Sequence, residues 1–187
     1  MSQTRQALLD AAYDAAVAGN WGRVRMADVA AAAGLSRQTL YYEFGTKDRL
    51  AEAVAMREAQ RFMTGAEAAR VGQEGTPAEA IAAAAEFTLT AAASNPLLKA
   101  VLTDDKSDLL PFLTTRAGHI LDAARDHTAS YLSIHWPDLP YGEVVLVAEM
   151  VNRLTISYLV LPGGRPDQVA SDIAHLVDRL LPGRDPA

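Results

Sequence analysis

Residues 28–50, which read DVAAAAGLSRQTLYYEFGTKDRL, decide the fold of this chain. Their pattern is typical of two short helices joined by a tight turn. Val29 and Leu40 provide apolar side chains where two crossing helices would pack, and Gly34 provides the positive φ that the turn requires. Ser36 then offers a side-chain oxygen that can cap the second helix. The segment therefore predicts a helix-turn-helix.

The second helix of a helix-turn-helix, the recognition helix, usually enters the major groove of DNA. Here Leu40 and Phe44, four residues apart, would point inward. On the opposite edge, Arg37 can donate two hydrogen bonds to guanine, Gln38 can bridge an adenine edge, and Thr39 can place its methyl group on thymine. Such residues also suit an ordinary solvated helix face, but the preceding turn and cap favour contact with DNA.

Phosphate contacts are expected from the second half of the recognition helix and from the start of the helix that follows it. Tyr41, Tyr42 and Lys47 carry donors that can bind phosphate oxygens, although the tyrosines would also suit half-buried positions in a core. The predicted DNA-binding residues are Arg25, Ser36, Arg37, Gln38, Thr39, Tyr41, Tyr42 and Lys47.

The segment from Thr4 to about Ala55 resembles the N-terminal DNA-binding domain of the TetR family of bacterial transcriptional regulators. The matching positions are Ala11-Ala12, Asp28-Val29-Ala30, Ala33-Gly34-Leu35-Ser36, Thr39-Leu40-Tyr41, Phe44, Lys47 and Leu50. The resemblance implies a homodimer whose two recognition helices read a palindromic operator in double-stranded DNA. It also implies a C-terminal domain that binds a small effector and dimerises.

Two residues depart from the family's pattern. Arg25 stands where a threonine or serine often caps the first helix of the motif and touches phosphate, so the cap is lost while a phosphate contact remains feasible. Glu43 replaces a common histidine after the tyrosines. Because an acid near phosphate is unfavourable, we expect Glu43 to turn aside or to pair with a base such as Arg37 or Lys47.

Composition limits the remaining possibilities. The chain has 187 residues, half of them apolar, which is enough to bury a substantial core. It has no cysteine, so a disulfide framework and a thiolate metal site are excluded. No apolar run reaches the length of about 18 residues that spans a bilayer, and charged residues interrupt the N-terminus. We therefore expect a cytoplasmic protein with no membrane partner.

Charge is distributed unevenly along the chain. The net charge is −6, but residues 1–63 carry 8 Lys/Arg against 7 Asp/Glu, whereas residues 64–187 carry 9 against 16. An N-terminal segment with a charge of +1 cannot bind DNA by bulk electrostatics. Specific contacts in each half of a dimer must therefore supply the affinity.

The hydrophobic pattern predicts an all-α protein. An N-terminal three-helix, helix-turn-helix DNA-binding domain (residues 1–50) would precede a helical bundle for ligand binding and dimerisation (residues 51–187). Thr46, the Thr76–Glu79 capping box and Asn95 mark helix starts. The expected helices outside the motif lie at about residues 3–18, 46–63, 76–93, 96–102, 109–135, 142–161 and 166–180. A helix break is expected from Gly65 to Gly75.

The last two predicted helices suggest where the dimer forms. Residues 142–161 are apolar almost all round, so this helix must be covered on more than one side. Together with the stripe on the last helix, it would form a four-helix interface between two subunits, although both helices could instead build the monomer core. The predicted interface residues are Met150, Leu154, Ile173, Val177 and Leu180.

The resemblance to the TetR family implies an effector site inside the C-terminal bundle. Its apolar lining would suit a lipophilic or aromatic molecule, with Tyr131 or Arg153 as polar groups that orient it. The same residues would also serve as plain core. The candidate effector-binding residues are Phe87, Leu98, Phe112, Leu113, His119, Tyr131, Met150, Arg153 and Tyr158.

Enzymatic motifs do not emerge from the sequence. The spacing of His119, Asp122 and Asp126 would place them on one helix face and could hold a metal, but a solvated polar face is the better interpretation. We predict no catalytic residue, no metal and no cofactor. The predicted function is a homodimeric repressor that a small effector releases from DNA. The alternative is an α-helical small-molecule-binding protein or enzyme built on the C-terminal bundle.

Overall fold

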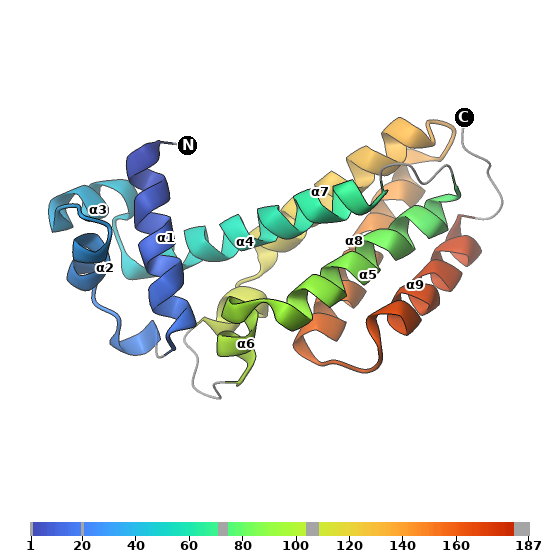
Figure 1. Ribbon diagram of the computed structural model, residues 1–187. Coiled ribbons are helices and arrows are strands. Elements are labelled where there is room, and N and C mark those ends of the chain that lie inside the picture. The colour runs from blue at the N-terminus through green and yellow to red at the C-terminus, as the bar shows by residue number, and fades with distance from the viewer. Residues whose placement is uncertain (1, 20, 71–74, 104–108, 182–187) are drawn as a thin grey trace. The chain divides into compact units, whose positions relative to one another are not determined.

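The computed structural model describes residues 2–19, 21–70, 75–103 and 109–181, and all regular structure within them is helical (Figure 1). The all-α prediction is confirmed. The elements are α1 (Gln3–Val17), η1 (Trp21–Arg23), α2 (Met26–Ala32), α3 (Arg37–Phe44), α4 (Lys47–Arg70), α5 (Pro77–Ser94), α6 (Pro96–Thr103), η2 (Leu110–Leu113), α7 (Gly118–His135), α8 (Tyr141–Val160) and α9 (Pro166–Leu180).

The chain divides into two compact units. The N-terminal unit comprises the residues up to Glu58 together with Asn95–Ala117, and the bundle unit comprises Ala59–Ser94 together with the residues from Gly118 onward. Helix α4 contributes its first half to one unit and its second half to the other. Both units are discontinuous in sequence, unlike the segments 1–50 and 51–187 drawn from the pattern.

The core of the N-terminal unit explains this discontinuity. Leu8 of α1 and Leu40 of α3 are fully buried, and the same apolar cluster includes Leu97 of α6 and Phe112 of η2. Because α6 and η2 bury their apolar faces here, they fold with the helix-turn-helix although about 40 residues of bundle sequence precede them.

Local capping signals place several helix starts. The Thr76 N–H donates to Glu79 Oε2 at 2.8 Å and the Glu79 N–H donates to Thr76 Oγ1 at 3.3 Å, which is the predicted capping box. Asn95 Oδ1 accepts the Leu98 N–H at 2.9 Å, and Thr46 Oγ1 accepts the Arg49 N–H at 3.2 Å. These three predicted starts are confirmed.

Two predicted boundaries are wrong. Helix α4 continues through Gly65 to Arg70, and the missing side chain of Gly65 lets the ring of Phe87 on α5 pack against its backbone; residues 71–74 of the expected break lie outside the described residues. A Cβ at Gly65 would lie 2.2 Å from Phe87 Cζ. The helix expected at 109–135 is interrupted, since the carbonyl of Pro111 accepts the N–H groups of Thr114 and Arg116 and ends a 3₁₀ turn before α7 begins.

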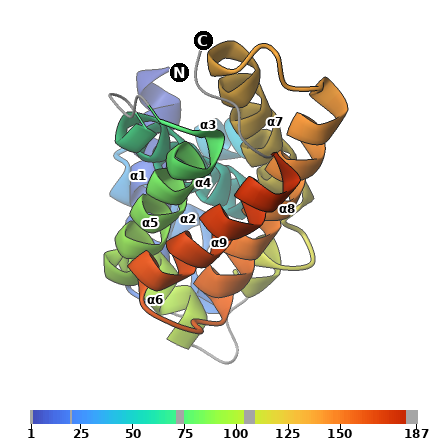
Figure 2. The same ribbon diagram turned by 90° about the vertical axis from the view of Figure 1, so that its right-hand side faces the viewer.

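The bundle unit is formed by the second half of α4 with α5, α7, α8 and α9. Its core contains fully buried side chains from several of these helices, among them Leu132 of α7, Val144 of α8 and Ile173 of α9. Figure 2 shows α8 and α9 side by side on the face turned toward the viewer. Among the described residues, Leu146 and Met150 of α8 and Leu176 and Leu180 of α9 have exposed side chains.

Candidate nucleic-acid interface

The turn of the helix-turn-helix has the predicted geometry. Gly34 adopts φ +67°, a conformation that L side chains rarely adopt. The Leu35 N–H donates to the Ala30 carbonyl at 2.9 Å and the Gly34 N–H donates to the Ala31 carbonyl at 3.0 Å, so α2 ends in a closed turn. Ser36 Oγ then accepts the Thr39 N–H at 3.0 Å and caps α3, as expected.

Helix α3 separates an apolar face from an exposed edge. Leu40 and Phe44 are buried, whereas Arg37, Gln38, Tyr41 and Tyr42 are exposed. Tyr42 is 88% exposed, more than any other large apolar or aromatic residue in the described part of the chain. An aromatic group costs free energy when it stays in water, so this edge fits a surface that a ligand covers.

Two hydroxyls at the start of α3 are already paired. Ser36 Oγ and Thr39 Oγ1 lie 2.8 Å apart, and Thr39 is half-buried. Thr39 therefore has its hydroxyl engaged in the free protein, which leaves its methyl group as the part available for a base. Ser36 contributes to the interface chiefly by holding the first turn of α3.

Arg37 is held along the exposed edge rather than extended into solvent. Its Nη2 donates to the Tyr41 hydroxyl at 3.4 Å, and its Cζ lies 5.2 Å from the centre of the Tyr41 ring. Stacking on a tyrosine restricts the long arginine side chain before binding. Less conformational entropy is then lost when the guanidinium pairs with a base edge.

Lys47 has a different environment from the one expected. Its Nζ donates to the Trp21 carbonyl at 2.5 Å and to the Gly22 carbonyl at 3.0 Å, so it holds η1 against the start of α4. An ammonium group has three donors, which leaves one N–H for phosphate. Arg25, the N-cap of α2, is exposed and makes no side-chain capping bond, as predicted.

Glu43 pairs with a base other than the two expected. Arg5 of α1 donates from Nη1 to Glu43 Oε2 at 3.5 Å and to the Glu43 carbonyl at 3.3 Å. Glu43 thus pairs with a base, which was one of the two expected outcomes, but the base is Arg5 rather than Arg37 or Lys47. Arg5 is 38 residues away in sequence, and only the packing of α1 across α3 brings the two together.

Arg57 joins α4 to α1, and the sequence analysis missed it. Its Nη1 donates to Asp10 Oδ1 at 2.6 Å and its Nη2 donates to the Leu9 carbonyl at 3.1 Å, with the side chain only 8% exposed. Nothing in the local pattern separates this arginine from its exposed neighbours. It fixes α4 to the helix-turn-helix and so belongs to the support of the interface.

Replacing Arg57 with methionine is expected to lower the free energy of unfolding by about 1–3 kcal/mol, because a buried carbonyl loses its charged donor. Asp10→Asn keeps an acceptor at an exposed position and serves as the control, with an expected loss below about 1 kcal/mol. Urea unfolding of both variants measures the difference. Equal losses would show that the Asp10 contact, rather than the bond to Leu9, carries the stabilisation.

Replacing Ser36 with alanine is expected to destabilise α3 by about 1 kcal/mol, because the Thr39 N–H loses its acceptor. Operator affinity should fall several-fold with it. Ser2, whose Oγ accepts the Arg5 N–H at 3.2 Å, caps α1 and provides a matched control. Thermal unfolding and DNA binding should separate the two variants, and an equal affinity loss for Ser2→Ala would contradict a role specific to the recognition helix.

The candidate effector residues do not gather in one place. Leu98, Phe112 and Leu113 belong to the N-terminal unit, where Phe112 and Leu113 pack in its apolar cluster. Three others, His119, Met150 and Arg153, are exposed. Buried or half-buried positions in the bundle unit are occupied by the remaining three, Phe87, Tyr131 and Tyr158.

The predicted dimer residues also separate into two groups. Ile173 and Val177 are 1% exposed and belong to the bundle core, so they have no surface left for a partner, and Leu154 packs partly against the same core. Met150 and Leu180 are exposed. The stripe on α9 therefore faces α5 and α8 of its own chain, and the outward positions lie three residues further along.

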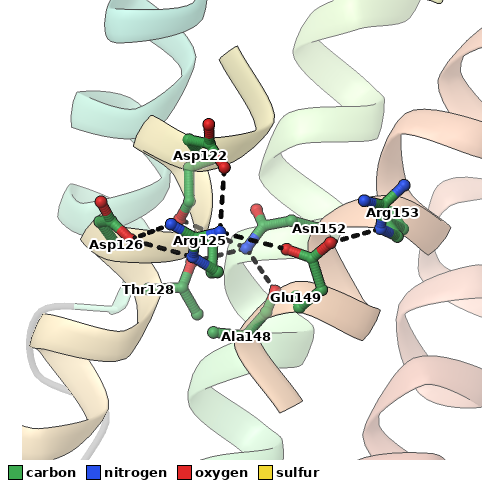
Figure 3. Close-up of polar contacts among 9 residues, drawn as sticks. Asp122, Arg125, Asp126, Thr128, Ala148, Glu149, Asn152 and Arg153 are labelled. Atoms are coloured by element: carbon green, nitrogen blue, oxygen red, sulfur yellow. Dashed lines mark hydrogen bonds and ion pairs between the residues drawn. The ribbon is translucent and has the colours of Figure 1, made fainter. Parts of the chain in front are cut away.

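The acidic residues near His119 are engaged with an arginine. Arg125 of α7 donates from Nη1 to Asp122 Oδ1 at 2.9 Å and from Nη2 to Asp126 Oδ1 at 2.8 Å (Figure 3). Both carboxylates are thus ion-paired with an arginine of the same helix. Among the described residues, no group of three His, Cys, Asp or Glu side chains is arranged to hold a metal ion.

Hydrogen bonds from a polar side chain of α8 connect this helix to α7. Asn152 of α8 donates from Nδ2 to Thr128 Oγ1 at 3.1 Å and to the Ala124 carbonyl at 3.3 Å (Figure 3). Glu149 accepts from Arg153 Nε at 2.5 Å on its outer side, and its other oxygen lies 3.9 Å from Arg125 Nη1. Arg153 is thereby directed toward Glu149 at the surface instead of into the bundle.

A capped recognition helix with an exposed polar and aromatic edge, joined by α4 to a helical bundle, defines a two-unit DNA-binding regulator. Comparisons with known proteins agree. Residues 8–54 match the family model described as bacterial regulatory proteins, tetR family, and residues 77–179 match that of the bacterial tetracyclin repressor C-terminal domain. No helix in the described ranges is both long and apolar enough to cross a membrane.

Individual relatives cover nearly the whole chain. The chain is 32% identical over 174 residues to the HTH-type transcriptional regulator AlkX of Mycobacterium tuberculosis, and the match covers 92% of this chain and 82% of that protein. The crystal structure of the TetR family repressor AlkX from a Dietzia strain, implicated in biodegradation of n-alkanes, matches with a TM-score of 0.78 and 31% identity, over 94% and 93% of the two chains. The repressor QsdR of R. erythropolis shares the fold, with a TM-score of 0.66 and 20% identity over 95% and 94%.

The chain belongs to the TetR family of transcriptional regulators. It is a DNA-binding regulator, and members of this family bind operators, respond to small-molecule effectors and act as dimers.

Proposed function

We propose that residues 1–50 read a palindromic operator through α3 and that residues 51–187 bind the effector and form the dimer. The observation that carries the proposal is the α3 edge, where Arg37, Gln38 and Tyr42 are exposed while Leu40 is fully buried. Two such edges in a dimer suit half-sites about one DNA turn, roughly 34–36 Å, apart. A cytoplasmic location follows from this proposal, because the DNA of a bacterium lies there.

Selection of bound DNA from a random duplex pool tests the proposal. Enrichment of a palindrome with half-sites about one turn apart is expected. Unenriched DNA would favour the alternative, a small-molecule-binding protein or enzyme built on the bundle. The selected palindrome then serves as the probe for every variant described below.

The dimer face is proposed on the outer sides of α8 and α9. Leu146 and Met150 on α8, and Leu176 and Leu180 on α9, are spaced four residues apart within each helix and are between 39% and 54% exposed. Exposed apolar stripes on adjacent helices indicate a protein interface. The interface that we propose therefore keeps the predicted Met150 and Leu180, and Leu146 and Leu176 take the place of the buried Ile173 and Val177.

The effector is proposed to be lipophilic and to bind within the bundle unit. Phe87, Tyr131 and Tyr158 remain as candidate contacts because they are buried or half-buried there. The related AlkX from Dietzia is implicated in the biodegradation of n-alkanes, and this supports an n-alkane or an n-alkane derivative as the ligand. Release of the operator upon binding requires a coupling free energy between the two sites, which acts reciprocally.

A further inference from the structure

Arg70, the last residue of α4, is a buried cation for which the described part of the chain provides no hydrogen-bond acceptor at Nε or Nη1. Its side chain is 4% exposed, and its Nε and Nη1 are shielded from solvent with no acceptor in reach. Within the described residues it forms no ion pair. A guanidinium is rarely buried unless a carboxylate or phosphate accompanies it, because desolvation of an unpaired charge is costly.

The surroundings of Arg70 come from α4 and α7. Its Cζ lies 4.7 Å from the centre of the Tyr131 ring, a cation–π contact that compensates part of the desolvation. One turn earlier on each helix, Glu67 Oε2 lies 3.6 Å from His127 Nε2. The Tyr131 ring lies 6.1 Å from that of Trp136. These residues form the Arg70 cluster.

The Arg70 cluster has more donors than acceptors. The buried Trp136 Nε1 is a donor only and has no partner, and His127 Nε2 also lacks a hydrogen bond. Among the described residues, the carboxylate that acts on Arg70 is that of Glu67, whose side chain is 54% exposed and whose Oε2 lies 3.6 Å from His127 Nε2. Burial lowers the pKa of Arg70, and the Coulombic effects of Tyr131 and Glu67 oppose that shift. An acceptor with negative charge is what the cluster lacks.

We propose that Arg70 binds the carboxylate of an amphiphilic organic acid whose apolar part lies in the bundle. Guanidinium and carboxylate form charge-assisted hydrogen bonds, and the same contact would neutralise the buried charge. The inference rests on the proposed effector function of the bundle and specifies its ligand class. A neutral hydrocarbon or alcohol is the wrong partner, because neither supplies an anionic acceptor.

Matched probes test the charge requirement on the full-length protein. Binding of decanoate is compared with 1-decanol, and of 4-phenylbutyrate with 4-phenylbutan-1-ol, by calorimetry. We expect each acid to bind about 10- to 100-fold more tightly than its alcohol, as one or two hydrogen bonds to a charged group imply. Equal affinities for acid and alcohol would overturn the proposal.

Substitution of Arg70 assigns the preference to this side chain. Arg70→Met should abolish the difference between acid and alcohol by weakening acid binding, whereas Arg165→Met removes an exposed arginine of the same unit and should preserve the difference. Without ligand, Arg70→Met should melt at the same or a higher temperature, because an unpaired buried charge has been removed. A preference for acids that survives in Arg70→Met would exclude Arg70.

Two further measurements keep the test decisive. If Arg70→Met does not fold, Arg70→Lys retains the charge but lacks the guanidinium, and it should bind the acids several-fold more weakly than the wild type. Operator binding without any ligand is measured in parallel. A wild-type protein that does not bind the operator would refute the proposed function. A wild-type protein that binds the operator but shows no preference for acids would refute the Arg70 site alone.

Discussion

Replacing Leu176 with aspartate is expected to convert the dimer into monomers and to weaken operator binding by about 10²- to 10⁴-fold. Leu176 is 49% exposed on α9, and the neighbouring helix α8 carries the exposed Leu146 and Met150 (Figure 2). An interface would bury the new carboxylate against apolar side chains without a partner, which costs far more than the leucine contributed. A monomer engages only one half-site, so the effective concentration of the second recognition helix is lost.

The control for this prediction is Ile134→Asp. Ile134 is 73% exposed on α7 of the same unit, so it tests the general effect of an acid at an exposed apolar position. We expect Ile134→Asp to remain dimeric and to bind the operator as the wild type does. Light scattering reports the mass of each variant, and fluorescence anisotropy with the selected palindrome reports the affinity. A Leu176→Asp variant that stays dimeric would place the interface elsewhere on the surface.

Local signals in the sequence predicted the helix-turn-helix and several helix starts because the interacting groups are three to five residues apart. Ser36 and Thr39 form a cap of this kind, as do Thr76 and Glu79. The positive φ of Gly34 follows from the same short-range geometry. Helix caps and tight turns can therefore be predicted from the local sequence pattern.

Packing between distant segments explains what the pattern did not reveal. Gly65 looked like a helix break, but the Phe87 ring lies where its side chain would be, and α4 continues. Arg57 and Glu43 find their partners on α1, 47 and 38 residues away. No local spacing encodes these contacts.

The dimer and effector residues could be narrowed only with the structure, for a related reason. A helix that is apolar on two sides does not reveal which side its own chain covers, and the stripe through Ile173 proved to face the core while Leu176 faces outward. Arg70 gave no signal at all in the sequence. Its burial depends on Tyr131 and on the position of α7, 61 residues further along the chain.

The second large effect is expected at Gln38, where substitution should change which DNA sequence is preferred. Gln38 is exposed on α3 between Arg37 and the half-buried Thr39, at the end of the helix that enters the groove first. Gln38→Ala removes a side chain that can donate to and accept from an adenine edge. We expect the discrimination at one base pair of each half-site to fall by about 1–3 kcal/mol.

Tyr42→Phe is the matched comparison on the same helix. It removes one hydroxyl from the most exposed aromatic side chain of α3 and should weaken binding to all sequences alike, by roughly 0.5–1.5 kcal/mol. Lys47→Ala is a poorer phosphate probe, because Lys47 also holds the Trp21 and Gly22 carbonyls. Competition binding against operators changed at each half-site position separates the two classes of contact. An equal loss on every operator for Gln38→Ala would remove Gln38 from the residues that read bases, and would leave Arg37 and the Thr39 methyl group to account for specificity.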